Sequence, residues 1–351
     1  MNKLLSATGI VVEYNPFHYG HLYHIEKVKS LSQCDVLIAV MSPHFVQRGE
    51  PAILDKWERT EIALKHGVDI VIELPTHLTL QSAEVFAKSA IKLLSMMKVN
   101  NIIYGSESLE KPKLSKPNKT LLKQGYSYAK AKNTQDFKPN QILGAYYEKY
   151  AQKYKINTQR ILRTVDYHDL ELHQKISSAS AIRKAHFEGQ DTTHTTPTNL
   201  NEHITTHLEM SYPLIRYQIF TKHKNLKDYL LVDEGIENLF YKLAMKHDNL
   251  EDFLEEATSK RYTKSRIQRT LMHILLQTPR DIEEIKEVRI LGMTQNGRNY
   301  LNQIKKDVPI CTSFKNYQFK NLEMKSTQVY VSMNPKKNQL LKKEVGSPIF
   351  I

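Results

Sequence analysis

Short apolar, β-branched runs alternate with helical stretches through the first half of the chain, and this alternation limits the possible folds more than any other feature. The apolar runs are Gly9–Val12, Asp35–Met41, Val68–Leu74 and Asn101–Tyr104. The helical stretches between them are Leu22–Ser32, Lys56–Lys65 and Ala83–Met97. Strands that are buried on both faces and joined by helices favour a parallel sheet with right-handed crossovers. We therefore predict an α/β fold in which helices cover both faces of a parallel sheet.

The alternation continues and then stops near residue 189. A helix, a strand and another helix are predicted at Gln141–Tyr154, Arg160–Val165 and Ala179–Glu188. The following segment, Gln190–Asn201, is rich in Thr, Pro and Asn, which is typical of a linker. A chain of 351 residues also exceeds the size of one ordinary core. We therefore expect two domains, 1–189 and 190–351.

The second half is predicted to be mainly helical and basic. Helical patterns cover Tyr212–Tyr229, Gly235–Lys246, Leu250–Thr258 and Thr263–Leu276, and a β-like piece lies at Gln328–Ser332. The helix at 263–276 has one apolar face, which we expect to be buried. The basic residues on or beside its other face are Lys260, Arg261, Lys264, Arg266 and Arg269.

The charge balance indicates a polyanionic partner without naming it. Fifty Lys and Arg against 37 Asp and Glu give a net charge of +13, although a soluble basic protein without such a partner has the same balance. The segment Lys111–Lys132 contributes seven lysines and no acidic residue, and it is predicted to be an exposed insertion, with a solvated linker as the simpler interpretation.

The cellular compartment is predicted from the lack of membrane-spanning, signal-peptide and disulfide patterns in the sequence. No apolar run approaches the roughly 18 residues that span a bilayer, and the first residues have no signal-peptide pattern. Cys34 and Cys311 cannot build a disulfide framework or a zinc knuckle. We therefore expect a protein of the reducing cytoplasm with no membrane partner.

The stretch VVEYNPFHYGHLYH, residues 11–24, crosses from the first predicted strand into the first predicted helix. In an open parallel sheet, ligands bind beyond the carboxyl ends of the strands, where helix N-termini meet. A helix that begins near His18 offers amide donors and a partial positive charge, which suit a phosphate, and Gly20 lets a nucleotide approach the backbone. His18 and His21 share one face and could stabilise charge at an α-phosphorus.

Two other interpretations of these histidines remain open. Three histidines at three-residue steps could be zinc ligands, although this spacing spreads His18 and His24 apart around the helix. They could also be unrelated surface histidines. The residues themselves therefore predict a phosphate site, with a zinc site and unrelated surface histidines as the two alternatives.

The pattern H-x-G-H directly after a first strand resembles the signature of the nucleotidyltransferase superfamily that is related to class I aminoacyl-tRNA synthetases. The second signature of that superfamily, S-S/A-S/T-x-I-R, is matched by SASAIR at 178–183. A hydroxyl-rich helix start with Ser178 and Ser180, followed by Arg183, suits the β- and γ-phosphates of a nucleotide. The resemblance implies a Rossmann-like (HUP-type) fold, a nucleotide-binding catalytic domain at 1–189, and catalytic roles for His18, His21 and Arg183.

Longer stretches resemble the bacterial tRNA(Met) cytidine acetate ligase family: VVEYNPFHYGHLYH, VMSPHFVQRGEPAI, DIVIELP, YGSES, PNQILG and SSASAIRK. Residues 200–351 resemble the C-terminal part of that family more loosely, with KRYTKSRIQRTLMHILL as the best match. That family uses ATP to activate acetate as acetyl-adenylate and acetylates the exocyclic amine of the wobble cytidine in elongator tRNA(Met). The resemblance implies ATP, acetate and this tRNA as partners. We also expect Mg²⁺ with the leaving pyrophosphate.

The positions that the resemblance assigns to ATP binding are Val11, Val12, Glu13, Tyr14, Asn15, Pro16, Phe17, His18, Tyr19, Gly20, His21, Leu22, Tyr23, His24, Gly105, Asn140 and Arg163, to which the second signature adds Ser178 and Ser180. Contacts with tRNA are expected from Lys260, Arg261, Arg266 and Arg269. Two departures from the family pattern occur, Gln141 after Asn140 where a second asparagine is usual, and Pro43 in place of glycine.

Several alternatives remain at this stage. The loop Gln47–Glu50 could line the entry of the cytidine, or Arg48 and Glu50 could form a local ion pair. A small-molecule adenylyltransferase that makes a dinucleotide cofactor would share both signatures, but it would not explain the basic helical second half. A non-catalytic nucleic-acid-binding protein is disfavoured by two intact phosphate motifs.

Overall fold

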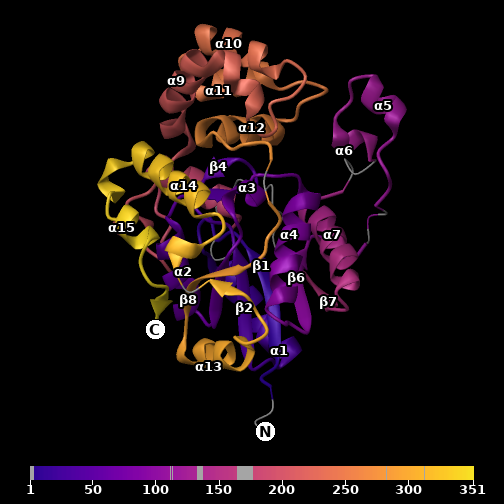
Figure 1. The fold of residues 1–351 in the computed structure, drawn as a ribbon, viewed down its shortest axis with the longest axis vertical. Helices are drawn as coiled ribbons and strands as arrows, with labels where there is room; N and C mark the ends of the chain where they lie inside the picture. The colour runs from indigo at the N-terminus through magenta and orange to yellow at the C-terminus, as the bar shows by residue number, and fades with distance from the viewer. Residues whose placement is uncertain are drawn as a thin grey trace.

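A mixed sheet forms the centre of the molecule (Figure 1). The computed structural model describes residues 4–110, 112, 114–132, 137–163, 177–281, 283–311 and 313–351. The sheet has eight strands in the order β10-β8-β5-β2-β1-β6-β7, and β9 pairs with β8. Its strands are β1 (Ala7–Val12), β2 (Val36–Met41), β5 (Ile70–Glu73), β6 (Asn101–Ser106), β7 (Asn157–Leu162), β8 (Val288–Met293), β9 (Ile310–Cys311) and β10 (Ile349–Phe350). The strands of the first half that belong to this sheet, β1, β2, β5, β6 and β7, run parallel, which confirms the predicted fold class. Strands β3 (Phe45–Val46) and β4 (Glu50–Pro51) form a separate antiparallel pair.

Helices cover both faces of this sheet because its strands are apolar on both sides. In β2 the residues Val36, Ile38 and Val40 join one hydrophobic cluster, and Leu37, Ala39 and Met41 join the other. The first cluster includes apolar residues of α4 (Ala83–Met96), α7 (Pro139–Lys153) and α13 (Gln295–Ile304). The second includes those of α1 (Tyr19–Ser32), α2 (Lys56–Lys65) and α8 (Ala179–Phe187). The carboxyl ends of the parallel strands and the starts of α1, α7 and α8 therefore meet on one side.

A helical unit follows and lies at the top of the molecule in Figure 1. It consists of α9 (Tyr212–Lys222), α10 (Ile236–Lys246), α11 (Leu250–Ala257) and α12 (Lys264–Leu276), all close to the predicted helical stretches. The predicted apolar face of α12 is buried, and its residues belong to the same hydrophobic cluster as α1 and α2. None of the helices in the described ranges is long and apolar enough to cross a membrane.

The last part of the chain returns to the sheet. Strand β8 pairs with β5 in antiparallel fashion, and β10 pairs with β8. The β-like piece predicted at Gln328–Ser332 was wrong, because it lies inside helix α14 (Lys320–Met333), where Tyr330 and Val331 are buried against the body of the protein. The domain boundary at 189/190 stays a prediction, and residues on both of its sides contribute strands to one sheet.

A buried ionic cluster fastens this C-terminal part to the sheet. The Lys56 ammonium lies 2.6 Å from a Glu73 oxygen and 2.9 Å from Glu344, at the end of α15 (Leu340–Glu344). The Arg289 guanidinium contacts the same two carboxylates at 2.8 and 2.6 Å. All four side chains are almost fully buried, and removing any one of them would leave an uncompensated charge, which costs about 3–5 kcal/mol.

Two short helices in the lysine-rich segment form an arm beside this body (Figure 1). They are α5 (Lys119–Lys123) and α6 (Tyr128–Ala131), and most of the described lysines around them are exposed, as predicted. Lys132 is the exception, because its ammonium is buried against Glu84 at 2.6 Å. The backbone amide of Ser127 donates to the carbonyl of Lys260 at 3.1 Å, so the arm reaches the loop before α12. The remaining helices are α3 (Thr76–Thr79) and five 3₁₀ turns at 200–202, 208–211, 223–228, 314–316 and 335–337.

Candidate active site

A cavity opens where β1, β6 and β7 end and α1, α7 and α8 begin. Most of the predicted ATP-binding residues line it, namely Val11, Val12, Glu13, Tyr14, Asn15, His18, Gly20, His21, Tyr23, His24, Gly105, Asn140 and Arg163. The others, Pro16, Phe17, Tyr19, Leu22, Ser178 and Ser180, are not among the lining residues. The structure thus brings both signatures to one cavity, although parts of each face elsewhere.

Two residues shape the turn between β1 and α1: Tyr14 by its backbone conformation and His18 by capping the helix. Tyr14 has a left-handed backbone, with φ of 52°, and its ring is buried. Such a conformation is uncommon outside glycine and is typical of functional loops. Four residues later, His18 caps α1, as its ring Nδ1 accepts a hydrogen bond from the Gly20 amide at 3.1 Å. The predicted start of the helix near His18 and Tyr19 is therefore confirmed.

The amide donors that we expected to be free at this helix start are occupied. Tyr19 N–H donates to the Thr195 carbonyl at 3.2 Å, and the His21 and Leu22 amides donate to the His18 carbonyl at 2.8 and 3.2 Å. With the Gly20 amide bound to the His18 ring, the first turn has its donors satisfied within the protein. The expectation of free amides was wrong, because the side chain chosen as a ligand also serves as the cap. The groups of this turn that can still face the cavity are the two imidazoles.

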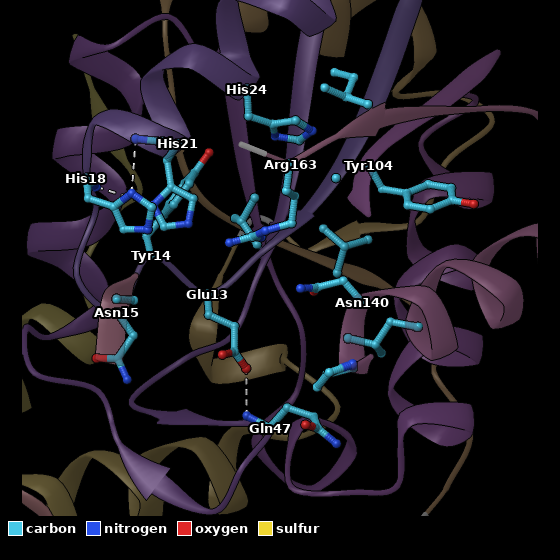
Figure 2. A pocket seen from close by; sticks show the side chains of 18 of the residues that line it. Glu13, Tyr14, Asn15, His18, His21, His24, Gln47, Tyr104, Asn140 and Arg163 are labelled. Carbon is cyan, nitrogen blue, oxygen red and sulfur yellow. Dashed lines mark hydrogen bonds between the residues drawn. The ribbon is translucent and has the colours of Figure 1, made fainter. Parts of the chain in front are cut away.

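The two imidazoles are stacked and held in one tautomer (Figure 2). Their ring centroids lie 3.8 Å apart, and His21 Nδ1 accepts from the His18 amide at 3.3 Å. Since both Nδ1 atoms accept hydrogen bonds, a neutral ring carries its proton on Nε2. Burial, with a smaller effect of Arg163, lowers the pKa of His18 to about 3, and burial also lowers the pKa of His21 well below its usual range. Both side chains are thus neutral Nε2–H donors at neutral pH.

The zinc interpretation of the three histidines loses support from this geometry. The Nδ1 atoms of His18 and His21 are already occupied, and His24 lies one turn further along α1. Burial lowers the pKa of His24 to about 4. Within the described ranges, no three His, Cys, Asp or Glu side chains come together as a set of metal ligands.

The opposite wall carries Gly105, Arg163 and Asn140. Figure 2 shows Arg163 between the stacked imidazoles and Asn140. A Cβ atom on Gly105 would lie 3.2 Å from Arg163 Cγ, so this glycine of β6 makes room for the arginine rather than directly for a ligand. Asn140, in the first turn of α7, donates from Nδ2 to a Glu107 oxygen at 2.6 Å. Its carbonyl oxygen thereby keeps a defined orientation beside the cavity.

The second signature is divided between a structural cap and the cavity. Ser178 is the N-cap of α8, and its hydroxyl accepts from the Ala181 amide at 3.0 Å. Arg183, one turn on, lines the cavity and donates to the Asn15 carbonyl and to Glu50, each at 2.7 Å. Glu50 therefore pairs with Arg183. Arg183 joins the H-x-G-H loop to the loop that was predicted to admit the cytidine.

Sequence reasoning missed a buried arginine behind these loops. Arg59 of α2 is fully buried and donates to the carbonyls of Leu54 at 3.0 Å, Glu13 at 2.6 Å and Ser42 at 3.0 Å, and also to that of Pro43. Burial lowers its pKa to about 10. One side chain thus holds the loops after β1 and β2 together. Nothing in its local sequence distinguishes it from an ordinary helix arginine.

The four basic residues predicted to contact tRNA have different environments. Lys260 is exposed, and its ammonium lies 3.5 Å from the centre of the Tyr126 ring in the arm. Arg261 pairs with Glu234 at 2.6 Å, and Arg266 lies 3.3 Å from Asp233. Arg269 is half-buried, and its backbone packs on Gly49, where a Cβ atom would lie 2.4 Å from the Arg269 nitrogen. Helix α12 therefore reaches from the arm to the loop that borders the cavity.

Comparisons with known proteins identify relatives of this chain. The family model described as HIGH Nucleotidyl Transferase matches residues 5–344. A tRNA(Met) cytidine acetate ligase of Geobacillus sp. (strain WCH70) is 36% identical, with 98% of this chain and 99% of the relative covered. One from Listeria monocytogenes is 38% identical, with 93% and 94% covered. The crystal structure of Thermotoga maritima TmcAL has a TM-score of 0.86 at 29% identity, covering 99% of this chain and all of the other. The structure of that protein bound with alpha-thio ATP has a TM-score of 0.84 at the same identity.

Proposed function

This chain belongs to the HIGH nucleotidyltransferase family and, within it, to the tRNA(Met) cytidine acetate ligases, and from that membership we propose that it acetylates a tRNA(Met) cytidine at the expense of ATP. The observation that carries the proposal is the meeting of both phosphate signatures at one cavity. Arg183 of the second signature donates to the carbonyl of Asn15, in the loop that leads into the first signature, at 2.7 Å.

The first half-reaction forms acetyl-adenylate. An acetate oxygen attacks the α-phosphorus of ATP in line, and pyrophosphate leaves with the electron pair of the broken P–O bond. No protein nucleophile is needed, because orientation and neutralisation of the developing charge supply the acceleration. His18 and His21 would donate from Nε2 to the phosphate oxygens, with Arg163 and Arg183 as the cations on the other sides of the cavity.

Acetate and Mg²⁺ complete this half-reaction. Mg²⁺ is usually bound by substrate phosphates together with few carboxylates, so we treat it as part of the nucleotide substrate. Acetate would lie beside the α-phosphate in the same cavity, close to the polar side chains of Asn15 and Gln47. The proposed compartment is the cytoplasm.

The second half-reaction transfers the acetyl group to RNA. The exocyclic amine of the wobble cytidine of elongator tRNA(Met) attacks the acyl carbon and AMP leaves, so the base must be splayed out of its stack. The rim of the cavity next to Arg48 and Gly49 adjoins α12. We therefore propose that Lys260 and its basic neighbours at 261, 266 and 269 lie along the path of the tRNA backbone.

Isotope exchange tests the proposal. The enzyme should exchange labelled pyrophosphate into ATP only when acetate is present, and it should then acetylate elongator tRNA(Met) but not initiator tRNA. Exchange that requires a mononucleotide and ignores acetate would instead identify a dinucleotide-forming adenylyltransferase. No exchange with either acceptor would refute adenylate chemistry at this site.

A further inference from the structure

Glu13 directly follows β1, and hydrogen bonds hold both its backbone and its side chain. Its backbone carbonyl accepts from Arg59 Nη1 at 2.6 Å, and its side-chain Oε1 accepts from the Gln47 amide at 2.7 Å. The next residue, Tyr14, has the left-handed backbone that turns the chain toward α1. These contacts fix a carboxylate at the point where the first strand meets the nucleotide loop.

Glu13 lines the cavity, and Figure 2 shows its side chain between Asn15 and Asn140 with the carboxylate directed toward Gln47. The hydrogen bond from the Gln47 amide uses one of the two carboxylate oxygens of Glu13. A carboxylate in a cavity built for ATP and acetate requires a reason, because it repels both anions.

A second carboxylate, that of Glu50, also lines the cavity, but it is part of an ion pair. Glu50 is paired with Arg183 at 2.7 Å and accepts from Asn15 Nδ2 at 3.3 Å. Its charge is therefore balanced by the Arg183 guanidinium. Glu13 has no such ion pair within 4 Å among the described residues, so it is the better proton acceptor of the two.

We propose, on the basis of the function above, that Glu13 is the general base of acetyl transfer. As the cytidine amine nitrogen bonds to the acyl carbon of acetyl-adenylate, the Glu13 carboxylate accepts a proton from that nitrogen. The tetrahedral intermediate then collapses, the bond from the acyl carbon to the AMP oxygen breaks, and AMP leaves as its anion. Glu13 ends the step protonated and returns the proton to water. The adenylation step requires no such acceptor, since acetate is already ionised.

The electrostatics of the site agree with this role. Burial is the main cause that raises the pKa of Glu13, and Glu50 raises it further, against the lowering effects of the Gln47 amide, Arg48 and Arg183. A base whose pKa is moved toward the working pH is a better proton acceptor than an ordinary carboxylate. Because the ionised form is active, the transfer rate should fall as the pH decreases through this raised pKa.

The test separates the two half-reactions in the variant Glu13→Gln. Its amide oxygen can still accept from the Gln47 amide, so the loop is expected to keep its conformation. Acetyl-adenylate is trapped with hydroxylamine, which attacks acyl-adenylates without a catalytic base, and transfer is followed in single turnovers with saturating tRNA. General bases contribute about 10²–10⁴-fold. We expect transfer to fall at least 100-fold and hydroxamate formation to fall less than tenfold, with tRNA affinity within twofold of wild type.

Glu50→Gln is the comparator, and Glu13→Asp provides a pH readout. Glu50→Gln should impair both half-reactions to a similar degree, because it disturbs Arg183. Glu13→Asp should restore part of the transfer rate with an altered pH profile. Equal losses of hydroxamate and transfer in Glu13→Gln would show that Glu13 binds nucleotide or its Mg²⁺, and selective loss in Glu50→Gln alone would assign the base to Glu50. A wild-type enzyme that forms no hydroxamate from acetate would refute the proposed function itself.

Discussion

His18 combines two roles that a pair of substitutions can separate. Its Nδ1 caps α1 through the Gly20 amide, and its Nε2–H is the proposed phosphate donor. His18→Ala removes both, whereas His18→Asn keeps a good cap but is too short to reach a phosphate. Losing an N-cap costs about 0.5–2 kcal/mol of stability. Losing a hydrogen bond to a charged group costs about 1.5–3 kcal/mol, which corresponds to roughly tenfold to 150-fold in rate.

Both variants lose the ring that stacks on His21 at 3.8 Å, so the packing loss cancels when they are compared. We expect His18→Ala to be about 1 kcal/mol less stable than His18→Asn in urea unfolding. We expect both to lose acetate-dependent pyrophosphate exchange by more than tenfold. If His18→Asn kept the wild-type exchange rate, His18 would be only a helix cap, and the argument from its tautomer would be refuted.

Three further predictions concern the phosphate arginine, the RNA surface and acid stability. Arg183→Ala should lower the maximal rate of adenylate formation tenfold or more. Arg183→Lys should restore only part of that rate, because lysine cannot contact Glu50 and Asn15 with one planar fork. A full single-turnover rate with a lowered melting temperature in Arg183→Ala would mean that Arg183 is only a structural residue. Alanine at Lys260, Arg261, Arg266 and Arg269 together should spare adenylate formation and reduce the salt slope of tRNA binding by about 0.7–0.9 for each RNA phosphate that is no longer neutralised. An unchanged slope would place the RNA elsewhere. His77 is buried, and burial lowers its pKa to about 3, so its stabilising contribution is complete above pH 6.5 and lost as the pH falls toward 3. His77→Leu should therefore reduce the loss of unfolding free energy between pH 6.5 and 4 by up to about 1.4 kcal/mol per pH unit, and identical slopes in urea titrations would contradict this.

The strands and helices of the first half were predictable because each carries its own signal. The apolar runs that became β1, β2, β5 and β6 are buried on both faces, and the caps at His18 and Ser178 begin helices where expected. The return of the chain to the sheet was not predictable. β8 is a short strand that pairs with β5 more than 200 residues away, and this pairing depends on tertiary contacts that no local pattern records.

The site was predictable as a set of positions but not as a set of roles. The spacing of His18 and His21 located the cavity, yet the occupied amides and the tautomer became visible only with the Gly20 and His18 hydrogen bonds. Arg183 was expected to grip pyrophosphate alone, and the structure adds its bonds to Asn15 and Glu50. Arg59 had no signal at all, because its partners are backbone carbonyls, which every residue has.

Because Glu344 lies close to the C-terminal end of the sequence, the buried ionic cluster is completed only late in translation. A nascent chain presents β5 and Lys56 to the cell long before Arg289 and Glu344 have been translated, so the strand that β8 will cover is first an open edge. A chain stopped between Arg289 and Glu344 would hold the buried cations of Lys56 and Arg289 without one of the two carboxylates that contact both of them. The catalytic loops emerge early from the ribosome, but the buried ionic cluster that fastens the C-terminal part to the sheet is complete only when Glu344 has been added. An incomplete translation product should therefore be a target for chaperones and proteases rather than a partly active ligase.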